Sequence, residues 1–242
     1  MRVLMYLGRF VILRLFFCVA LYASLLCLGC AIPTFAQGAA PDEGASAIPT
    51  KSFFEARTGE SLNAPHIGII RYLEFFQIRK KWIYPDIGYV DFAHGNYREF
   101  FIGGGRTLID NKFVTWDQEL LYVQATGPAA ASARYLQPWS MLSVRFTPKF
   151  TSEIVYFPYF PLNDSAGFHQ VLERAKFEYA LKNHWKIGAG YAGVKFPSVP
   201  WVNKPLLTTT ISTKAGAFEF WLQKIPGGEQ VQFRYALIHT SR

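Results

Sequence analysis

Hydrophobic and polar residues alternate with a period of two along most of the chain after residue 50. Near the C-terminus the two sides of this alternation are Val231, Phe233, Tyr235 and Leu237 against Gln232, Arg234, Ala236 and Ile238. A similar stretch precedes it, with Phe218, Phe220 and Leu222 against Glu219, Trp221 and Gln223. Pro226-Gly227-Gly228 lies between the two stretches. Period-two alternation on both sides of a Pro-Gly turn predicts a β-hairpin.

The same alternation predicts strands further upstream. Residues 114–122, 136–146 and 185–191 each place large apolar side chains on one face and polar or small side chains on the other. Residues 168–181 fit a short amphipathic helix almost as well, but we predict a strand because both neighbours are strands. In all we expect about eleven strands between Ile67 and His239, most of them about 9–12 residues long.

So many antiparallel strands must avoid exposed edges, and closing into a barrel is the simplest way to do so. Charged residues of both signs recur on the polar face: Asp117, Glu119, Arg145, Arg174, Glu178, Lys186, Glu219 and Arg234. An apolar core cannot hold so many charged residues unless they pair closely, whereas the lumen of a barrel can pair or hydrate them. We therefore predict an all-β, antiparallel, up-and-down transmembrane β-barrel, with apolar side chains facing lipid and these eight residues lining the lumen.

Strand length, aromatic positions and loop lengths agree with this prediction. A tilted membrane strand needs roughly 9–11 residues. Aromatic residues gather near the expected strand ends and predict girdles at the membrane surfaces: Trp82, Tyr84, Tyr97, Tyr135, Trp139, residues 156–160 and Trp185. The long connections, residues 125–134, 161–168 and 196–204, fall on one side when strands are counted back from the last.

Barrels of this kind have an even number of strands. We therefore expect twelve, with one more strand near residues 51–60, and accept ten. The alternative architecture is a secreted β-sandwich or a lipocalin-like barrel with an aromatic core.

The first 36 residues predict a cleaved secretory signal peptide. The only charges there are Arg2, Arg9 and Arg14, and an apolar run over residues 15–31 precedes a small residue at the expected cleavage point, Ala36. The apolar run is also long enough for an uncleaved inner-membrane anchor. Residues 37–50 are small, polar and Pro-containing and predict a disordered leader, which leaves residues 51–242 for the barrel.

A lipoprotein signal is a further alternative for the same segment. Cys30 follows Leu-Cys-Leu-Gly and resembles the lipidated cysteine of a lipobox. Cys27 stands three residues earlier, where a branched aliphatic residue is usual. Whether Cys30 is lipidated is therefore left open by the sequence.

Composition and charge narrow the possible partners. Of the 242 residues, 50% are hydrophobic and 17% are aromatic, which excludes a disordered chain. Cleavage after Ala36 would remove all three cysteines and three arginines but no acidic residue. The net charge would then fall from +8 to +5, from 22 basic and 17 acidic residues. The remaining basic residues are dispersed, so we expect no nucleic-acid partner.

Histidines are the first candidates for catalysis, and we assign none of them. His94 lies in a turn, and His169 follows Asp164 and Ser165 in an expected outer loop. Triad partners converge in space rather than along one loop, so we interpret both histidines as turn or loop residues. His184 and the last histidine of the chain, at position 239, are expected at a membrane interface.

Two further patterns could indicate a chemical role, but a structural role explains each of them better. Asp117 and Glu119 project to the same side of one strand, about 7 Å apart. They could share a proton or hold a cation, but we expect ion pairs with Arg145 or Arg174. Gly103-Gly104-Gly105-Arg106 lacks the helix and the Lys-Ser/Thr pair of a phosphate loop, so it predicts tight lumen packing or a strand bend. We predict no catalytic residue, metal or cofactor.

The signal peptide, the alternating strands and the aromatic-rich last strand resemble bacterial outer-membrane β-barrel proteins as a broad class. The resemblance covers about Lys51 to His239 and implies insertion into outer-membrane lipid from the periplasm by the barrel insertion machinery. Members usually end on an aromatic residue, whereas this chain continues to His239-Thr240-Ser241-Arg242. Phe233 or Tyr235 would have to take that role, followed by a short tail.

The expected role is passive, as a narrow pore for small solutes or as a membrane scaffold. Ten to twelve strands leave a small bore, since porins with open aqueous channels use about 16–18. Lumen charges would set which solutes pass, or would seal the bore by pairing. The alternatives are an outer-membrane lipid-modifying hydrolase with a rim histidine, His94 or His169, and a soluble periplasmic barrel that binds an apolar ligand.

Overall fold

The computed structural model describes residues 50–62, 70–79, 83–92 and 95–241. The predicted signal peptide and most of the predicted leader lie outside these residues, as does His94. The described residues form twelve strands: β1 (Thr50–Ser61), β2 (Ile70–Arg79), β3 (Tyr84–Phe92), β4 (Tyr97–Asp110), β5 (Val114–Thr126), β6 (Arg134–Arg145), β7 (Phe150–Pro161), β8 (His169–Lys182), β9 (Trp185–Lys195), β10 (Val202–Thr213), β11 (Gly216–Ile225) and β12 (Gly228–Ser241). No helix in the described part is long and apolar enough to cross a membrane.

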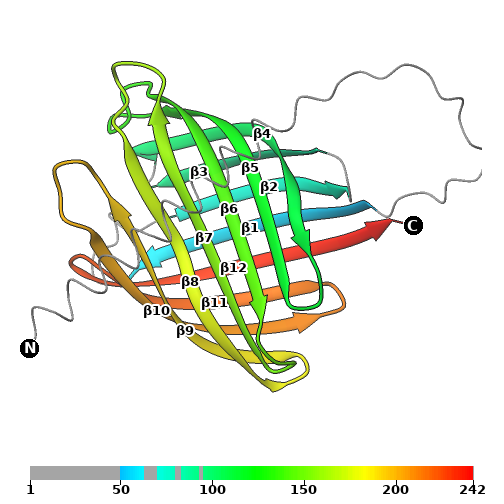
Figure 1. Ribbon diagram of the computed structural model, residues 1–242. Helices are drawn as coiled ribbons and strands as arrows, with labels where there is room; N and C mark the ends of the chain where they lie inside the picture. Colours follow the sequence, from blue (N-terminus) through cyan, green and yellow to red (C-terminus); the bar gives the residue numbers. More distant parts are fainter. Residues whose placement is uncertain (1–49, 63–69, 80–82, 93–94, 242) are drawn as a thin grey trace, which may run out of the picture. The chain divides into compact units, whose positions relative to one another are not determined.

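Each strand pairs antiparallel with its neighbours in sequence, and β1 pairs with β12, so the sheet closes (Figure 1). The predicted all-β, up-and-down barrel of twelve strands is confirmed. The additional strand expected near residues 51–60 is β1. The strand predicted over residues 168–181 is β8, and the helical alternative is wrong.

The long connections lie together at one end of the barrel. They follow β5, β7 and β9, and antiparallel pairing brings the three to the same end, here called the loop end. Thr50 pairs with Ser241, so the described chain starts and finishes at the opposite end, here called the turn end. Because β12 continues to Ser241, the residues after Tyr235 extend the strand and do not form a tail.

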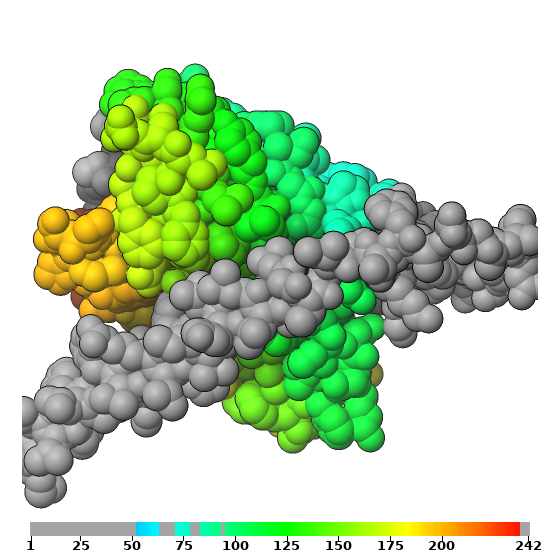
Figure 2. All heavy atoms as spheres, turned by 45° about the horizontal axis from the view of Figure 1, so that its top comes forward, coloured from blue at the N-terminus to red at the C-terminus, as the bar shows by residue number. Residues whose placement is uncertain are grey.

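Side chains alternate between the two faces of the wall as the sequence predicts. On β11, Phe220 and Leu222 are exposed, while Glu219, Trp221 and Gln223 are buried inside the barrel. The outer face carries large exposed apolar side chains on most strands, among them Phe75, Ile87, Phe100, Ile102, Tyr122, Phe177, Ile187, Leu207 and Val231. In Figure 2 the atoms drawn in green to yellow-green, which belong to β4 to β8, pack closely against one another. The barrel therefore has an apolar exterior.

Many of the aromatic residues expected in girdles point inward instead. Tyr84, Tyr135, Trp139, Phe157 and Tyr159 are all buried inside the barrel, so a girdle position is wrong for them. Their places in the alternation explain this, since each falls on the same face as an inner polar residue of its own strand. The partly buried ring of the tyrosine at position 97 also turns inward, whereas the tryptophan at position 185 is exposed on the outer face. Trp82 lies outside the described residues.

A bulge in β8 changes which residues face inward. Val155 of β7 pairs with Arg174, but the next residue, Tyr156, pairs with Leu172, so Glu173 has no partner opposite it. A bulge of this kind places two successive side chains on one face. Glu173 and Arg174 both point into the barrel, where Glu173 contacts Arg57 of β1.

Candidate functional site in the barrel interior

The middle of the barrel interior holds a network of ion pairs, some of which join strands that are not neighbours. Arg234 of β12 contacts Glu55 of β1 at 2.5 Å and Glu219 of β11 at 2.9 Å. Glu219 also pairs with Lys176, which comes from β8, three strands away around the wall. Glu178 lies 3.5 Å from the same Lys176. The Glu219–Lys176 pair crosses the interior, because β11 is not hydrogen-bonded to β8.

A second part of the network lies around Arg57. Its guanidinium contacts Glu55 at 2.8 Å and Glu173 at 2.5 Å. It also lies between two aromatic rings, 5.1 Å from the centre of Tyr72 and 5.0 Å from the centre of Trp221. Cations over aromatic faces gain further stabilisation when they are removed from water. Arg57 thus joins β1 to β2, β8 and β11 across the lumen.

Little free space remains at this level. The gap bounded by Phe53, Tyr72, Trp139 and the network has a volume of about 10 Å³. That volume holds on the order of one water molecule. The gap among these side chains therefore holds nothing much larger than a water molecule in this conformation.

A larger cavity lies between the network and the loop end. Its volume is about 510 Å³. Ala129 and Gly167 line it from the long connections, and Arg57 and Gln232 line it near the middle. Aromatic side chains contribute much of the wall, among them Tyr97, Tyr135, Trp139, Phe157, Tyr159, Phe168, Phe196 and Trp221. The cavity is thus a largely apolar vestibule above a charged constriction.

His169 belongs to the aromatic wall of this cavity. Its ring stacks on Tyr159 at a centroid distance of 4.1 Å and meets the edge of Tyr135 at 5.3 Å. Its Nδ1 lies 3.0 Å from the carbonyl oxygen of Gly167. His169 opens the strand as expected, but its ring is buried within an aromatic cluster, so the solvated setting that we expected is wrong. Its neighbours hold the ring by stacking, and the contacts that place it here do not include Asp164 or Ser165.

Among the other histidines, the structure describes the side chain of His184 alone. His184 is exposed in the turn between β8 and β9, where its carbonyl oxygen accepts a hydrogen bond from the Ser212 amide. His239 lies in β12, but its side chain is outside the described part of the structure.

The wall formed by β3 to β5 is acidic, and hydroxyl groups donate hydrogen bonds to some of its carboxylates. Tyr84 donates a hydrogen bond to Glu119 at 2.9 Å, and Thr107 donates one to Asp117 at 2.5 Å. The ion pairs that we expected for Asp117 and Glu119 are wrong, because Arg174 pairs with glutamates of β7 and β8 instead. β5 and β8 are three strands apart around the wall, and glutamates of β7 and of β8 itself, which lie nearer, satisfy the guanidinium.

A further acid of this wall lies closer to the loop end. Glu99 of β4 accepts hydrogen bonds from Tyr97 at 2.5 Å and from Tyr159 of β7 at 2.9 Å. Hydroxyl donors thus satisfy this buried carboxylate without a cation.

The eight residues predicted to line the lumen occupy three settings. Arg174, Glu178, Glu219 and Arg234 come together through the network, with Lys176 between them. Asp117 and Glu119 are buried in the acidic wall. The remaining two are Lys186, whose ammonium lies 3.5 Å from the Thr151 hydroxyl, and Arg145, which is exposed at the turn end of β6.

Sequence reasoning missed five members of the network: Glu55, Arg57, Glu153, Glu173 and Lys176. The alternation could have found most of them. Lys176 shares its face with Glu178, and the pattern Phe-Glu-Ala-Arg in β1 places Glu55 and Arg57 on one face. The inward position of Glu173 depends on the bulge, which the alternation does not contain.

The glycines of β4 fit the tight packing expected from the sequence. A Cβ atom on Gly103 would lie 2.1 Å from the carbonyl oxygen of Leu120. One on Gly105 would lie 2.3 Å from Cγ of Glu119. The glycines therefore let inner side chains of the neighbouring strands approach one another over β4.

No protein-family model matches this sequence, and no curated protein matches it. Among solved structures, the KdgM porin is similar at a TM-score of 0.55 and 10% identity, covering 78% of this chain and 99% of that chain. The KdgM porin in complex with disordered oligogalacturonate gives 0.56 and 11%, with the same coverage. The NanC porin gives 0.53 and 7%, covering 78% of this chain and 100% of that one. These likenesses show that the chain has the fold of outer-membrane β-barrel porins, as the resemblance implied.

Proposed function

We propose that this chain is a passive pore of the bacterial outer membrane that admits small polar solutes. The observation that carries the proposal is the inverted polarity of the barrel. Apolar side chains cover the outside, and ion pairs and buried carboxylates occupy the inside. A soluble barrel would place them the other way round, because large apolar surfaces are stable in lipid and not in water.

The proposal includes the route to the membrane and the orientation there. Residues 1–36 act as a cleaved signal peptide, and the insertion machinery delivers the barrel to outer-membrane lipid from the periplasm. The turn end then faces the periplasm and the loop end faces the cell exterior, since both chain ends are periplasmic in such barrels. Solutes enter from the loop end through the 510 Å³ cavity.

The ion-pair network acts as the constriction of this pore. The space beside it is about 10 Å³, so passage requires the charged side chains to separate or rotate. The charges at this level therefore select solutes by size and charge. The KdgM porin was solved with an oligogalacturonate, a charged sugar chain, and we propose small polar molecules of that general kind as candidate solutes here.

Planar-bilayer recording of the purified, refolded protein tests the pore. We expect small single-channel steps from the parent protein. The double variant R57A/E173A removes one ion pair that crosses the lumen and should give larger steps. The matched control E60A/K224A also removes one charge of each sign, but both are exposed in the described barrel, and its steps should equal those of the parent.

Two results would count against the pore. An absence of conductance from the parent and from R57A/E173A, both folded, would leave a sealed membrane scaffold. Equal conductance in R57A/E173A and the parent would remove the network from the conduction path.

A further inference from the structure

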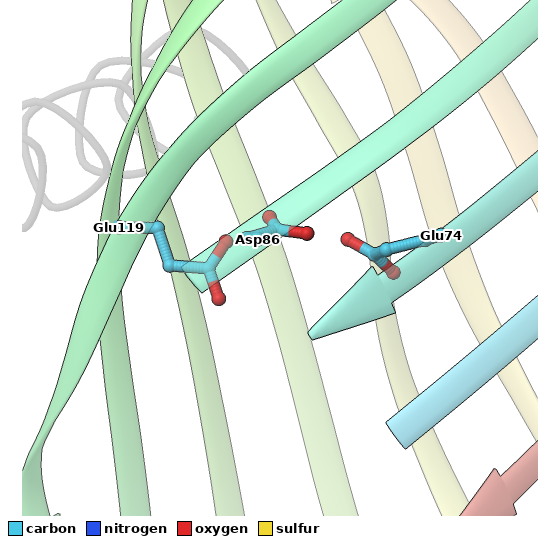
Figure 3. Close-up of side chains that lie close together, drawn as sticks. All are labelled: Glu74, Asp86 and Glu119. Carbon is cyan, nitrogen blue, oxygen red and sulfur yellow. The ribbon is translucent and has the colours of Figure 1, made fainter. Parts of the chain in front are cut away.

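Three carboxylates meet inside the acidic wall, close to the turn end. Glu74 comes from β2, Asp86 from β3 and Glu119 from β5 (Figure 3). One oxygen from each lies within 4.8 Å of the others. The exposed fractions of the three residues are 5%, 1% and 5%. In Figure 3 the Asp86 carboxylate lies between the other two.

The register of the strands produces this meeting. Asp86 pairs with Gly103 of β4, and Glu119 pairs with Gly105 two residues further along the same strand. These two glycines have no side chains, so nothing on β4 separates Asp86 from Glu119. On the other side, Glu74 pairs with Gly88, which is also inward-facing and also lacks a side chain.

The protein supplies few partners for these oxygens. The Tyr84 hydroxyl donates to Oε1 of Glu119 at 2.9 Å. In the part of the chain that the structure describes, both Asp86 carboxylate oxygens and Oε2 of Glu119 are fully buried and accept no hydrogen bond within the usual distance and angle limits. Within the described residues, the ion pairs of the interior involve other acids. Buried carboxylates without donors or cations are costly, so another species must neutralise them.

We propose that Glu74, Asp86 and Glu119 bind a divalent metal ion, Ca²⁺. The ligand set contains only carboxylate oxygens, which hard cations prefer. Ca²⁺–oxygen distances of about 2.3–2.6 Å place two ligands of one ion up to about 5 Å apart. Mg²⁺, with distances of about 2.0–2.1 Å, limits this separation to about 4.2 Å. The three oxygens lie within 4.8 Å of one another, inside the limit for Ca²⁺, and side chains from three different strands suit its flexible coordination better than the near-ideal octahedron that Mg²⁺ demands.

The ion would have a route in and a structural effect. Glu74 lines the large cavity, so a cation can reach the cluster from the lumen. Once bound, the ion joins β5 to β2 and β3, and β5 is hydrogen-bonded to neither of them. The ion thus braces the acidic wall in the way that the ion-pair network braces the opposite side. This site does not depend on whether the barrel conducts.

Ca²⁺ binding to the full refolded chain tests the site. The protein is refolded in a zwitterionic detergent, which excludes anionic lipid as a metal ligand, and treated with EDTA. Equilibrium dialysis against ⁴⁵Ca²⁺ should then give about one bound ion, with a Kd below about 1 mM. Tb³⁺ should also bind and emit on excitation of tyrosine, because Tyr84 contacts Glu119 directly.

Asp86→Asn should lower the Ca²⁺ affinity at least tenfold and abolish the Tb³⁺ emission. The variant should still fold, since it removes one charge from a repulsive cluster, and its heat-modifiable gel migration checks this. The control Glu99→Gln alters another buried carboxylate of the same wall, whose oxygens accept from two tyrosines, and should bind Ca²⁺ like the parent.

Three results would overturn the site. The first is that the folded parent binds no Ca²⁺ up to about 10 mM. The second is that Asp86→Asn binds Ca²⁺ as tightly as the parent, and the third is that the parent binds Mg²⁺ as tightly as Ca²⁺. The first would mean that protons, and not a metal ion, neutralise the cluster. All three are distinct from a failure of the pore, which only the bilayer recording detects.

Discussion

Replacement of Leu207 by arginine tests whether the outer face of the barrel contacts lipid or water. Leu207 is 59% exposed on the outer face of β10, with Leu222 and Ala189 beside it on the neighbouring strands. It lies five residues from the first residue of β10 and six from the last. With a rise of about 3.4 Å per residue and a tilt of about 40°, it sits about 13–16 Å from each end of the strand.

That depth is close to the midplane of a bilayer with a hydrocarbon core about 30 Å thick. An arginine at this depth on a lipid-facing strand destabilises a barrel by about 2–4 kcal/mol. In water, the same exchange at an exposed site changes stability by no more than about 0.5 kcal/mol. The loss of stability expected for Leu207→Arg is therefore several-fold larger if the outer face contacts lipid than if it contacts water.

The matched control makes the same exchange near a strand end. Leu181 is 45% exposed and stands one residue before the end of β8, at the turn end. Leu181→Arg reaches the membrane interface and should cost only about 0–1 kcal/mol. The assay is urea unfolding of each variant in phospholipid vesicles, followed by tryptophan fluorescence. If Leu207→Arg costs less than about 0.5 kcal/mol, or no more than Leu181→Arg, the outer face is not in contact with lipid.

Three further variants test the packing of the interior. Gly103→Val places a side chain against the backbone of β5 and should cost about 3 kcal/mol or prevent refolding, as judged from heat-modifiable migration and urea unfolding; parent-like stability would contradict the close approach. Tyr159→Phe removes the hydroxyl that donates to Glu99 and should cost about 1–3 kcal/mol in the same assay, so an unchanged midpoint would remove that bond. Glu219→Gln leaves Lys176 without its closest carboxylate and should cost about 3 kcal/mol, and a neutral or stabilising effect would show that the pair is dispensable.

The strand pattern could be predicted from the sequence because a strand that separates two environments must alternate. Residues such as Phe220 and Glu219 carry opposite signals at adjacent positions, and a tight turn at Gly227 fixes where the alternation stops. The number of strands followed from the same signals, together with the need for an even count. The local pattern of apolar, polar and turn residues therefore predicts most of the strands of this barrel.

The partners inside the barrel could not be predicted in the same way. Lys176 and Glu219 are 43 residues apart, and only the closure and curvature of the sheet bring them together. The alternation assigns a face to each residue but does not say which strand lies opposite. For this reason Asp117 and Glu119 were expected to pair with Arg145 or Arg174, whereas Arg174 contacts nearer glutamates and Arg145 is exposed at the turn end.

The aromatic residues show a second limit of the sequence pattern. Tyr135 and Trp139 stand where a girdle is expected along the strand, yet they share a face with the buried Gln137. Position along a strand and face of a strand are independent properties, and the face decides whether a ring meets lipid or lumen. The same rings form the wall of the large cavity, which no local pattern indicates.

The location of the protein in cells tests the central claim most directly. The full chain is expressed in a Gram-negative host, and outer membranes, inner membranes and soluble periplasm are separated on a density gradient. We expect the protein in the outer-membrane fraction, resistant to extraction with urea, and migrating faster on a gel before boiling than after. Recovery as a soluble periplasmic protein with heat-independent migration would contradict a barrel that faces lipid.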